Sequence, residues 1–189
     1  MTEQEFFTVH YGLTTNIELL DSTFMLPSQS IFEAEIPAPF IVASEFSQLD
    51  ALTESARLEL KNSDFKHVVQ LLDTQNSKLN LLLTFMLSQQ DEPHSRFITS
   101  TFGASRFSLR YPNALEIGTQ ARCKLFLDHP AAAIYCYSSV IDCQADEQHY
   151  LITMKYDLLR DTDQDLLIKA ALYQQQKLLR QRSLDRNKP

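Results

Sequence analysis

The longest regular pattern in the sequence lies in residues 40–92, which contain neither glycine nor proline. Large apolar residues recur there at intervals of seven, the spacing that keeps one face of a helix apolar. If these residues occupy position a of the heptad, two of the four residues at position d are also apolar, whereas Lys61 and Gln75 at the other two interrupt the seam. We therefore predict a helical segment over residues 44–90. Its seam consists of Leu58, Phe65, Val68, Leu72, Leu79, Leu82 and Met86.

Two arrangements of this segment fit the pattern. One continuous helix would rise about 1.5 Å per residue and extend roughly 70 Å, beyond the body of a small domain. Copies of the chain would then bury the seam against one another, because exposed apolar surface is unfavourable in water. The alternative is a helical hairpin that is broken at the polar run 61–64 and fills an ordinary core. We favour the continuous helix, and hence a homo-oligomer.

The N-terminal residues 6–40 are predicted to form a strand and an extended connection. Phe7, Val9, Tyr11 and Leu13 alternate with smaller or polar residues, as in a strand. Prolines at 27, 37 and 39 are then expected to keep residues 23–40 out of regular helix.

After Pro93 the apolar period changes to two, and residues 95–157 are predicted to be β-structure. Phe107, Leu109 and Tyr111 show this alternation. Both faces of 133–142 are partly apolar, so this strand is expected to be covered on both sides. Turn residues separate short successive strands, which favours a small antiparallel barrel.

The chain ends in a predicted helix over residues 161–184, with Asp161 as its N-cap and Gln164 completing a capping box. With 189 residues, the sequence predicts a single α+β domain over 1–189.

Composition narrows the possible functions. A net charge of -7 argues against general binding of nucleic acid, which needs clustered lysine and arginine. No charge-free run of 18 apolar residues occurs, so no membrane insertion is expected. Cys123, Cys136 and Cys143 lack metal-ligand spacing and leave one cysteine unpaired in any disulfide scheme, which fits a reducing cytoplasm. We expect a cytoplasmic protein without a metal or cofactor.

Catalytic motifs are also missing from the sequence. Its five histidines show no metal-binding spacing, and neither a glycine-rich phosphate loop nor a GxSxG motif occurs. We therefore do not expect an enzyme.

The order of the elements resembles a known family. Antiparallel strands ending in 150–156, then residues 158–165, then a helix rich in glutamine and arginine through 174–182, resemble the PilZ domain of bacterial cyclic di-GMP signalling. The inserted heptad helix is similar to the atypical, tetrameric PilZ subgroup, and residues 71–87 are the most similar piece. The resemblance covers about Phe6 to Arg182. It implies a six-stranded antiparallel barrel with a long inserted coiled-coil-like helix and a C-terminal helix, assembled as a homotetramer.

The same resemblance implies where cyclic di-GMP would bind. PilZ receptors use an RxxxR motif before the barrel, whose guanidinium groups suit phosphate and guanine edges, and a [D/N]xSxxG motif on the following strands. The second motif aligns with Thr99, Thr101 and Ala104, with Gly103 beside it, so the carboxylate or amide and the final glycine are absent. No arginine precedes Arg57, so the first motif does not exist here.

Two functional hypotheses follow. The preferred one is a non-catalytic oligomeric adaptor that binds an unidentified protein in control of motility, pili, biofilm or virulence and does not bind cyclic di-GMP by the standard motifs. The alternative is a divergent cyclic di-GMP receptor with another pocket, for which Arg96, Arg106 and Arg110 are candidate anion contacts. Arg106 and Arg110 have the RxxxR spacing but follow the second motif, and we interpret them first as a solvated strand face.

Overall fold

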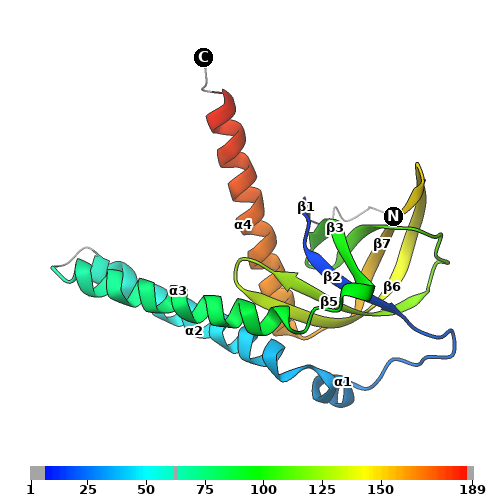
Figure 1. Ribbon diagram of the computed structural model, residues 1–189, viewed down its shortest axis with the longest axis horizontal. Helices are drawn as coiled ribbons and strands as arrows, with labels where there is room; N and C mark the ends of the chain where they lie inside the picture. Colours follow the sequence, from blue (N-terminus) through cyan, green and yellow to red (C-terminus); the bar gives the residue numbers. More distant parts are fainter. Residues whose placement is uncertain (1–6, 62–63, 187–189) are drawn as a thin grey trace.

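The computed structural model describes residues 7–61 and 64–186. Phe6, at the predicted start of the N-terminal strand, and residues 62–63 of the predicted polar break lie outside this part. The described chain forms a β-barrel with an α-helical arm on one side and a long C-terminal helix (Figure 1).

The barrel has six antiparallel strands in the order β3-β2-β5-β6-β7-β4, and pairing of β3 with β4 closes it. The strands are β2 (Thr14–Leu19), β3 (Arg96–Gly103), β4 (Arg106–Tyr111), β5 (Gln120–Leu127), β6 (Ala132–Asp146) and β7 (His149–Leu158). A short β1 (Thr8–His10) pairs with the end of β3 beyond β2. The predicted α+β fold with a six-stranded barrel is confirmed.

Strand β6 is covered on both faces, as its sequence predicts. All its residues from Ala132 to Val140 are buried. Helix α1 (Gln29–Glu35) lies against this strand, where Phe32 stacks on Tyr135 at a centroid distance of 5.9 Å. The apolar run in β6 is therefore shared between the barrel and a covering helix.

The prediction that residues 23–40 avoid helix is wrong at α1. The prolines flank this helix at 27 and 37 instead of interrupting it, and buried Phe32 anchors its single apolar face. Pro39 lies in the first turn of the next helix, where a missing N–H group removes no helical hydrogen bond.

The prediction of one continuous helix over 44–90 is also wrong. The segment forms two helices, α2 (Ala38–Lys61) and α3 (Lys66–Ser88), which run side by side as a hairpin (Figure 1). At about 1.5 Å per residue, α3 is roughly 34 Å long. The polar run that separates the helices contains asparagine, serine and aspartate, whose side chains compete with helical hydrogen bonds.

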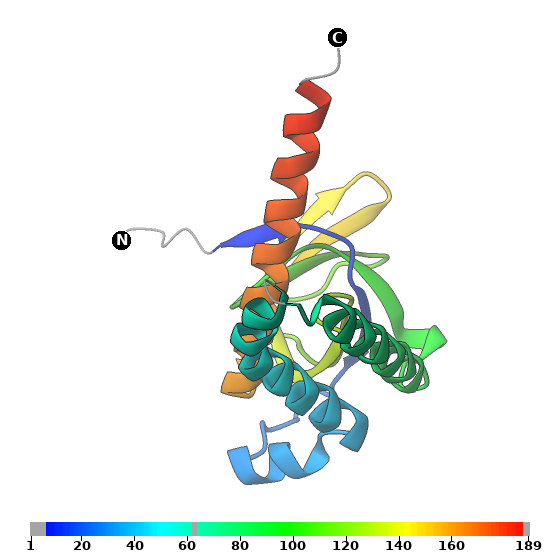
Figure 2. The same cartoon turned by 90° about the vertical axis from the view of Figure 1, so that its left-hand side faces the viewer.

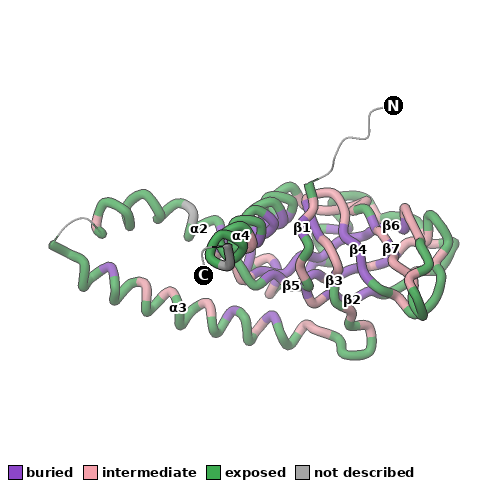
Figure 3. The backbone as a smooth tube through the Cα atoms, turned by 90° about the horizontal axis from the view of Figure 1, so that it is seen from above, coloured by how far each residue is buried: buried purple, intermediate pink, exposed green. Residues whose placement is uncertain are grey.

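The alternative, a hairpin that fills an ordinary core, is right about the hairpin but not about the core. Only the root of the hairpin joins the hydrophobic core, through Phe40 and Ala43 of α2 and Leu83 and Leu87 of α3. The rest projects from the barrel, and most of its tube is exposed (Figure 3). A short 3-10 turn (Pro93–Ser95) then leads into β3.

The C-terminal helix is α4 (Asp161–Arg186), close to its predicted bounds. Its first half packs Leu166, Leu167 and Ala170 into the core, and its second half projects from the barrel (Figure 2). The predicted capping box is wrong, because the backbone N–H groups of Asp163 and Gln164 donate to the carbonyl oxygen of Arg160. No helix in the described ranges is long and apolar enough to cross a membrane.

Gly103 is required by the pairing of β1 with β3. A Cβ atom at Gly103 would lie 2.2 Å from the carbonyl oxygen of Phe7, which is backbone and cannot move without opening the pair. We expect Gly103→Ala to lower the free energy of unfolding by about 1–3 kcal/mol, measured by urea denaturation. Gly12→Ala is the control, because its Cβ would press on a side-chain methyl of Ile98 at 2.8 Å and would meet backbone only at an ordinary contact distance, 3.6 Å from the carbonyl oxygen of Thr99. Equal losses in the two variants would contradict this account.

Candidate functional site

Thr99, at the motif position that carries aspartate or asparagine in PilZ receptors, has a structural role here. Its hydroxyl is buried and donates to the carbonyl oxygen of Tyr11 at 2.8 Å, while the N–H of Leu13 donates to it at 2.8 Å. Thr99 therefore holds the residues that connect β1 to β2 against strand β3. Its hydroxyl proton is already used within the barrel, so Thr99 has no donor to offer a ligand.

The other motif positions are used in the same way. The hydroxyl of Thr101 donates to Ser108 at 3.2 Å, in a chain of hydroxyls that continues to Thr153. Gly103 is buried under β1, and the carbonyl oxygen of Ala104 accepts from the side chain of Gln164. These four positions hold strands and helix α4 together.

The three candidate arginines do not converge on one site. Arg96 and Arg110 are each paired with a carboxylate, Arg96 with Asp91 at 2.6 Å and Arg110 with Asp146 at 2.7 Å. Arg106 is half-buried at the start of β4, opposite Lys155. Four residues along a strand separate Arg106 from Arg110 by about 13 Å.

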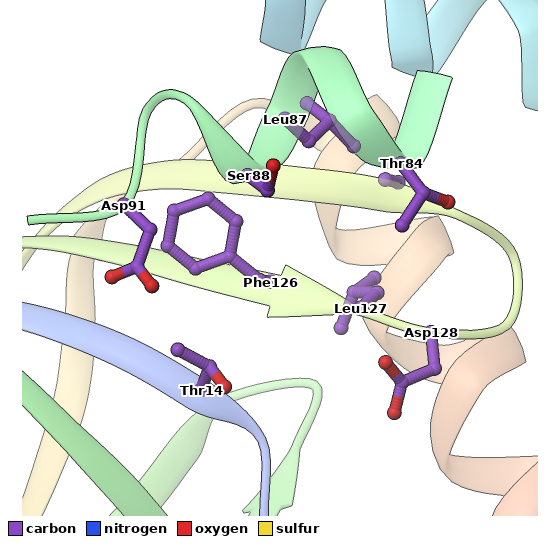
Figure 4. Close-up of a pocket in the computed structure, with 9 residues that line it drawn as sticks. Thr14, Thr84, Leu87, Ser88, Asp91, Phe126, Leu127 and Asp128 are labelled. Atoms are coloured by element: carbon purple, nitrogen blue, oxygen red, sulfur yellow. The ribbon is translucent and has the colours of Figure 1, made fainter. Parts of the chain in front are cut away.

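A small cavity of about 140 Å³ lies where α3 meets the barrel (Figure 4). Asp91 and Asp128 lie at its rim, and both carboxylates are already hydrogen-bonded, to Asn16 and to the hydroxyl of Tyr11 respectively. Ligand pockets in proteins usually enclose about 300–1,000 Å³. This cavity is therefore too small for a dinucleotide, and we interpret it as a packing gap between α3 and the barrel.

A larger cleft of about 470 Å³ separates the hairpin from the turn between β5 and β6. Its ionisable lining includes the carboxylates of Asp50 and Asp128. A neighbouring cleft between α2 and α3 contains Glu54 and the ion pair of Arg57 with Asp73. Uncompensated carboxylates repel the two phosphates of a cyclic dinucleotide, so neither cleft suits that ligand.

Along the middle of the hairpin, between buried Val69 and buried Leu83 of α3, the contact between α2 and α3 is polar. Arg57 makes two hydrogen bonds to the carboxylate of Asp73, at 2.8 and 3.1 Å, and these bonds lower the pKa of Asp73. Farther along, the amide of Asn76 donates to Asp50 at 3.4 Å. The contacts show that the helices are antiparallel, and they bury little apolar surface.

Many apolar side chains of the hairpin are exposed, although Val69, Leu83 and Leu87 of α3 are buried. Leu82 is 67% exposed, Leu72 55% and Leu79 46%, and all three belong to the predicted seam. Phe65 and Val68 extend the same exposed surface, and Met86 is partly buried near the root. Leu58 lies on α2, so the heptad spacing that joined it to the others does not follow one helix. We call Phe65, Val68, Leu72, Leu79, Leu82 and Met86 the α3 seam.

A joint that the sequence analysis missed fixes the hairpin to the barrel. Asn16 of β2 is buried, donates to Asp91 and to the carbonyl oxygen of Glu92, and accepts from the N–H of Glu92. Lys124 of β5 donates to the carbonyl oxygen of Gln90. An asparagine inside a strand pattern was the available signal, because strands disfavour that residue.

Comparison with known proteins supports the fold. No family model and no curated protein matches the sequence. A solved structure of a pathogenic protein from Xanthomonas campestris, described as a tetrameric PilZ domain self-assembled through an unusual helical bundle, matches with a TM-score of 0.57 and 15% identity, over 93% of this chain and 91% of that one. A weaker match, with a TM-score of 0.41 and 16% identity, is the Bacillus subtilis inhibitor of motility MotI/DgrA, over 43% of this chain and 42% of that one.

The fold is therefore that of an atypical PilZ domain, with helices inserted between the first two strands of the barrel. The sequence analysis predicted this fold from the order of the strands and the heptad spacing of the inserted segment.

The joint at Asn16 gives a direct test of how the arm is held. We expect Asn16→Ala to lower the free energy of unfolding by about 1–3 kcal/mol, because it leaves the backbone groups of Glu92 without their partner. Urea denaturation measures the change, and Asn76→Ala, which loses one exposed contact of 3.4 Å, is the matched control. If Asn16→Ala lowers the free energy of unfolding no more than the control does, Asn16 does not stabilise the joint.

Proposed function

We propose that this chain is a non-catalytic, self-assembling PilZ-like adaptor in cyclic di-GMP-linked control of motility, pili, biofilm or virulence. It acts through protein contacts and does not recognise cyclic di-GMP by the standard motifs. The observation that carries this proposal is the exposed α3 seam on an arm whose inner face is polar.

The seam supports self-association on energetic grounds. Full burial of a leucine side chain is worth about 1.5–3 kcal/mol, and several such residues line one helix. In the described chain all of them except Met86 are exposed, and α2 meets the middle of α3 through Arg57, Asp73 and other polar groups. A homotetramer is the favoured assembly, since the Xanthomonas protein of similar fold is described as a tetramer formed through a helical bundle.

The nucleotide-motif positions support a role without cyclic di-GMP. Thr99 and Thr101 are engaged in bonds within the barrel, and Gly103 is covered by β1. Arg96 and Arg110 are paired with carboxylates. Losing a charged hydrogen-bonded pair typically weakens binding by about tenfold to several hundredfold, so a site that lacks both standard arginines has lost most of its affinity.

A catalytic role receives no support from the cysteines. Burial, together with the hydrogen bond to Cys123, raises the pKa of the Cys136 thiol well above its usual value. A nucleophilic cysteine needs the opposite shift.

The assembly proposal is tested by placing charge in the seam. We expect Leu72→Glu with Leu79→Glu to convert the oligomer to monomer or to insoluble chain, because buried carboxylates without partners are strongly unfavourable. Light scattering measures the mass. Gln70→Glu with Thr74→Glu adds the same charge to exposed positions of α3 outside the seam and serves as control. An unchanged mass in the seam variant would exclude the seam from the interface.

The nucleotide proposal is tested by titration calorimetry with cyclic di-GMP. We expect no binding at micromolar concentration by the purified protein, because the motif positions are occupied. Micromolar binding would favour the divergent receptor, and the loss of that binding in Arg106→Ala and Arg110→Ala would locate the pocket on β4.

A further inference from the structure

Strand β6 is longer than its neighbour β5 and has an open edge. Its pairing with β5 ends at Ser139, and Val140 still bonds to the adjoining loop through Thr119 and Gly118. From Asp142 to Asp146 the strand pairs only with β7, and Ile141 lies at a register shift in that pairing. The other edge of β7 is covered by β4, whose Tyr111 lies opposite Tyr150.

The edge at 141–146 stands clear of the barrel, at the tip of the β6–β7 hairpin and on the side of the molecule away from the helical arm (Figure 1). Figure 2 shows the same hairpin projecting beyond the strands around it. In the described part of the chain, no other strand pairs with this side of β6. A free strand edge presents N–H and C=O groups that can pair with another extended chain.

We propose that the β6 edge, residues 141–146, docks an extended basic segment of a partner protein by strand addition. This inference rests on the adaptor function proposed above and names the kind of partner it takes. Backbone hydrogen bonds supply the affinity in such complexes, and side chains at alternate positions supply the choice of partner.

The charge of the edge determines the chemistry of the partner. Asp142 and Asp146 lie along it, exposed Glu147 follows in the turn, and exposed Glu116 lies in the loop that pairs with Val140. Arg110, paired with Asp146, compensates only part of this charge. Lysine or arginine at alternate positions of an added strand would lie opposite the carboxylates.

The same charges disfavour a second copy of this chain as the occupant. In a two-fold antiparallel pair centred on Gln144, Asp142 of each copy would face Asp146 of the other. Like charges directly opposite one another destabilise a strand pair. The α3 seam is on the far side of the barrel, so copies that assemble through it leave the edge free and display it several times.

The probe for this proposal is a fluorescein-labelled peptide, Lys-Val-Lys-Val-Lys-Val-Lys, added to the full-length protein at low salt. We expect binding by fluorescence anisotropy and at least about tenfold slower exchange of those amides of 142–146 that are not bonded to β7, with no change at 137–139, where both edges of the strand are paired. Two control peptides, one with glutamate in place of lysine and one with proline at the central position, should bind at least about tenfold more weakly.

A protein variant gives the complementary test. Asp142→Lys should weaken binding of the lysine peptide by about tenfold or more, whereas Glu45→Lys, at an exposed site on helix α2, should not. Circular dichroism checks that both variants fold.

Three results would overturn the proposal. They are no binding up to about 1 mM peptide, binding without slower exchange of the amides of 142–146 that are not bonded to β7, or protection of those same amides before peptide is added, as when a second copy covers them. Light scattering on the same samples reports self-association independently. A failure of strand addition is thus distinguishable from a failure of the assembly.

Discussion

The polar contact between α2 and α3 determines how the rest of the molecule can be used. Arg57, Asp73, Asp50 and Asn76 join the two helices along the middle of the hairpin, and most apolar residues of the α3 seam are exposed there. Water disfavours such a surface, and nothing in the described part of the chain covers most of it. Along this stretch the arrangement inverts the usual amphipathic helix pair, in which apolar faces meet and polar faces are solvated. The proposed assembly would bury the exposed surface.

The barrel supports this arm and keeps few features of a nucleotide receptor. Thr99 and Gly103, at positions that would contact cyclic di-GMP in a PilZ receptor, hold β1 in place against β3. Asn16 and Lys124 hold the end of α3. Side chains that could contact a ligand instead fix the angle between barrel and arm. The barrel therefore supports the arm. The function of the protein has to be argued from these contacts and not from the fold alone.

The sequence predicts the barrel well and the arm only in part. Alternation in strands such as 106–111 and two-sided burial of 133–140 follow directly from which residues are apolar. Most residues at the heptad spacing are exposed on α3, and their role in assembly stays a prediction. Leu58 matches the spacing by coincidence across the break, since seven-residue spacing does not report where a chain reverses. Helix α1 was missed because its one buried residue, Phe32, gives no periodicity. The hydrogen bonds of Asn16 and Thr99 join residues more than 70 positions apart, which local patterns cannot reveal.

Helices α2 and α3 each belong to two environments. At the root, Phe40 and Leu83 are part of the same core that stabilises the barrel, while farther out Leu72 is exposed in the single chain. Because α3 is continuous from one region to the other, burial of Leu72 in the proposed assembly would also favour the folded root. Unfolding and dissociation would then be coupled by mass action, and the melting temperature would rise with protein concentration.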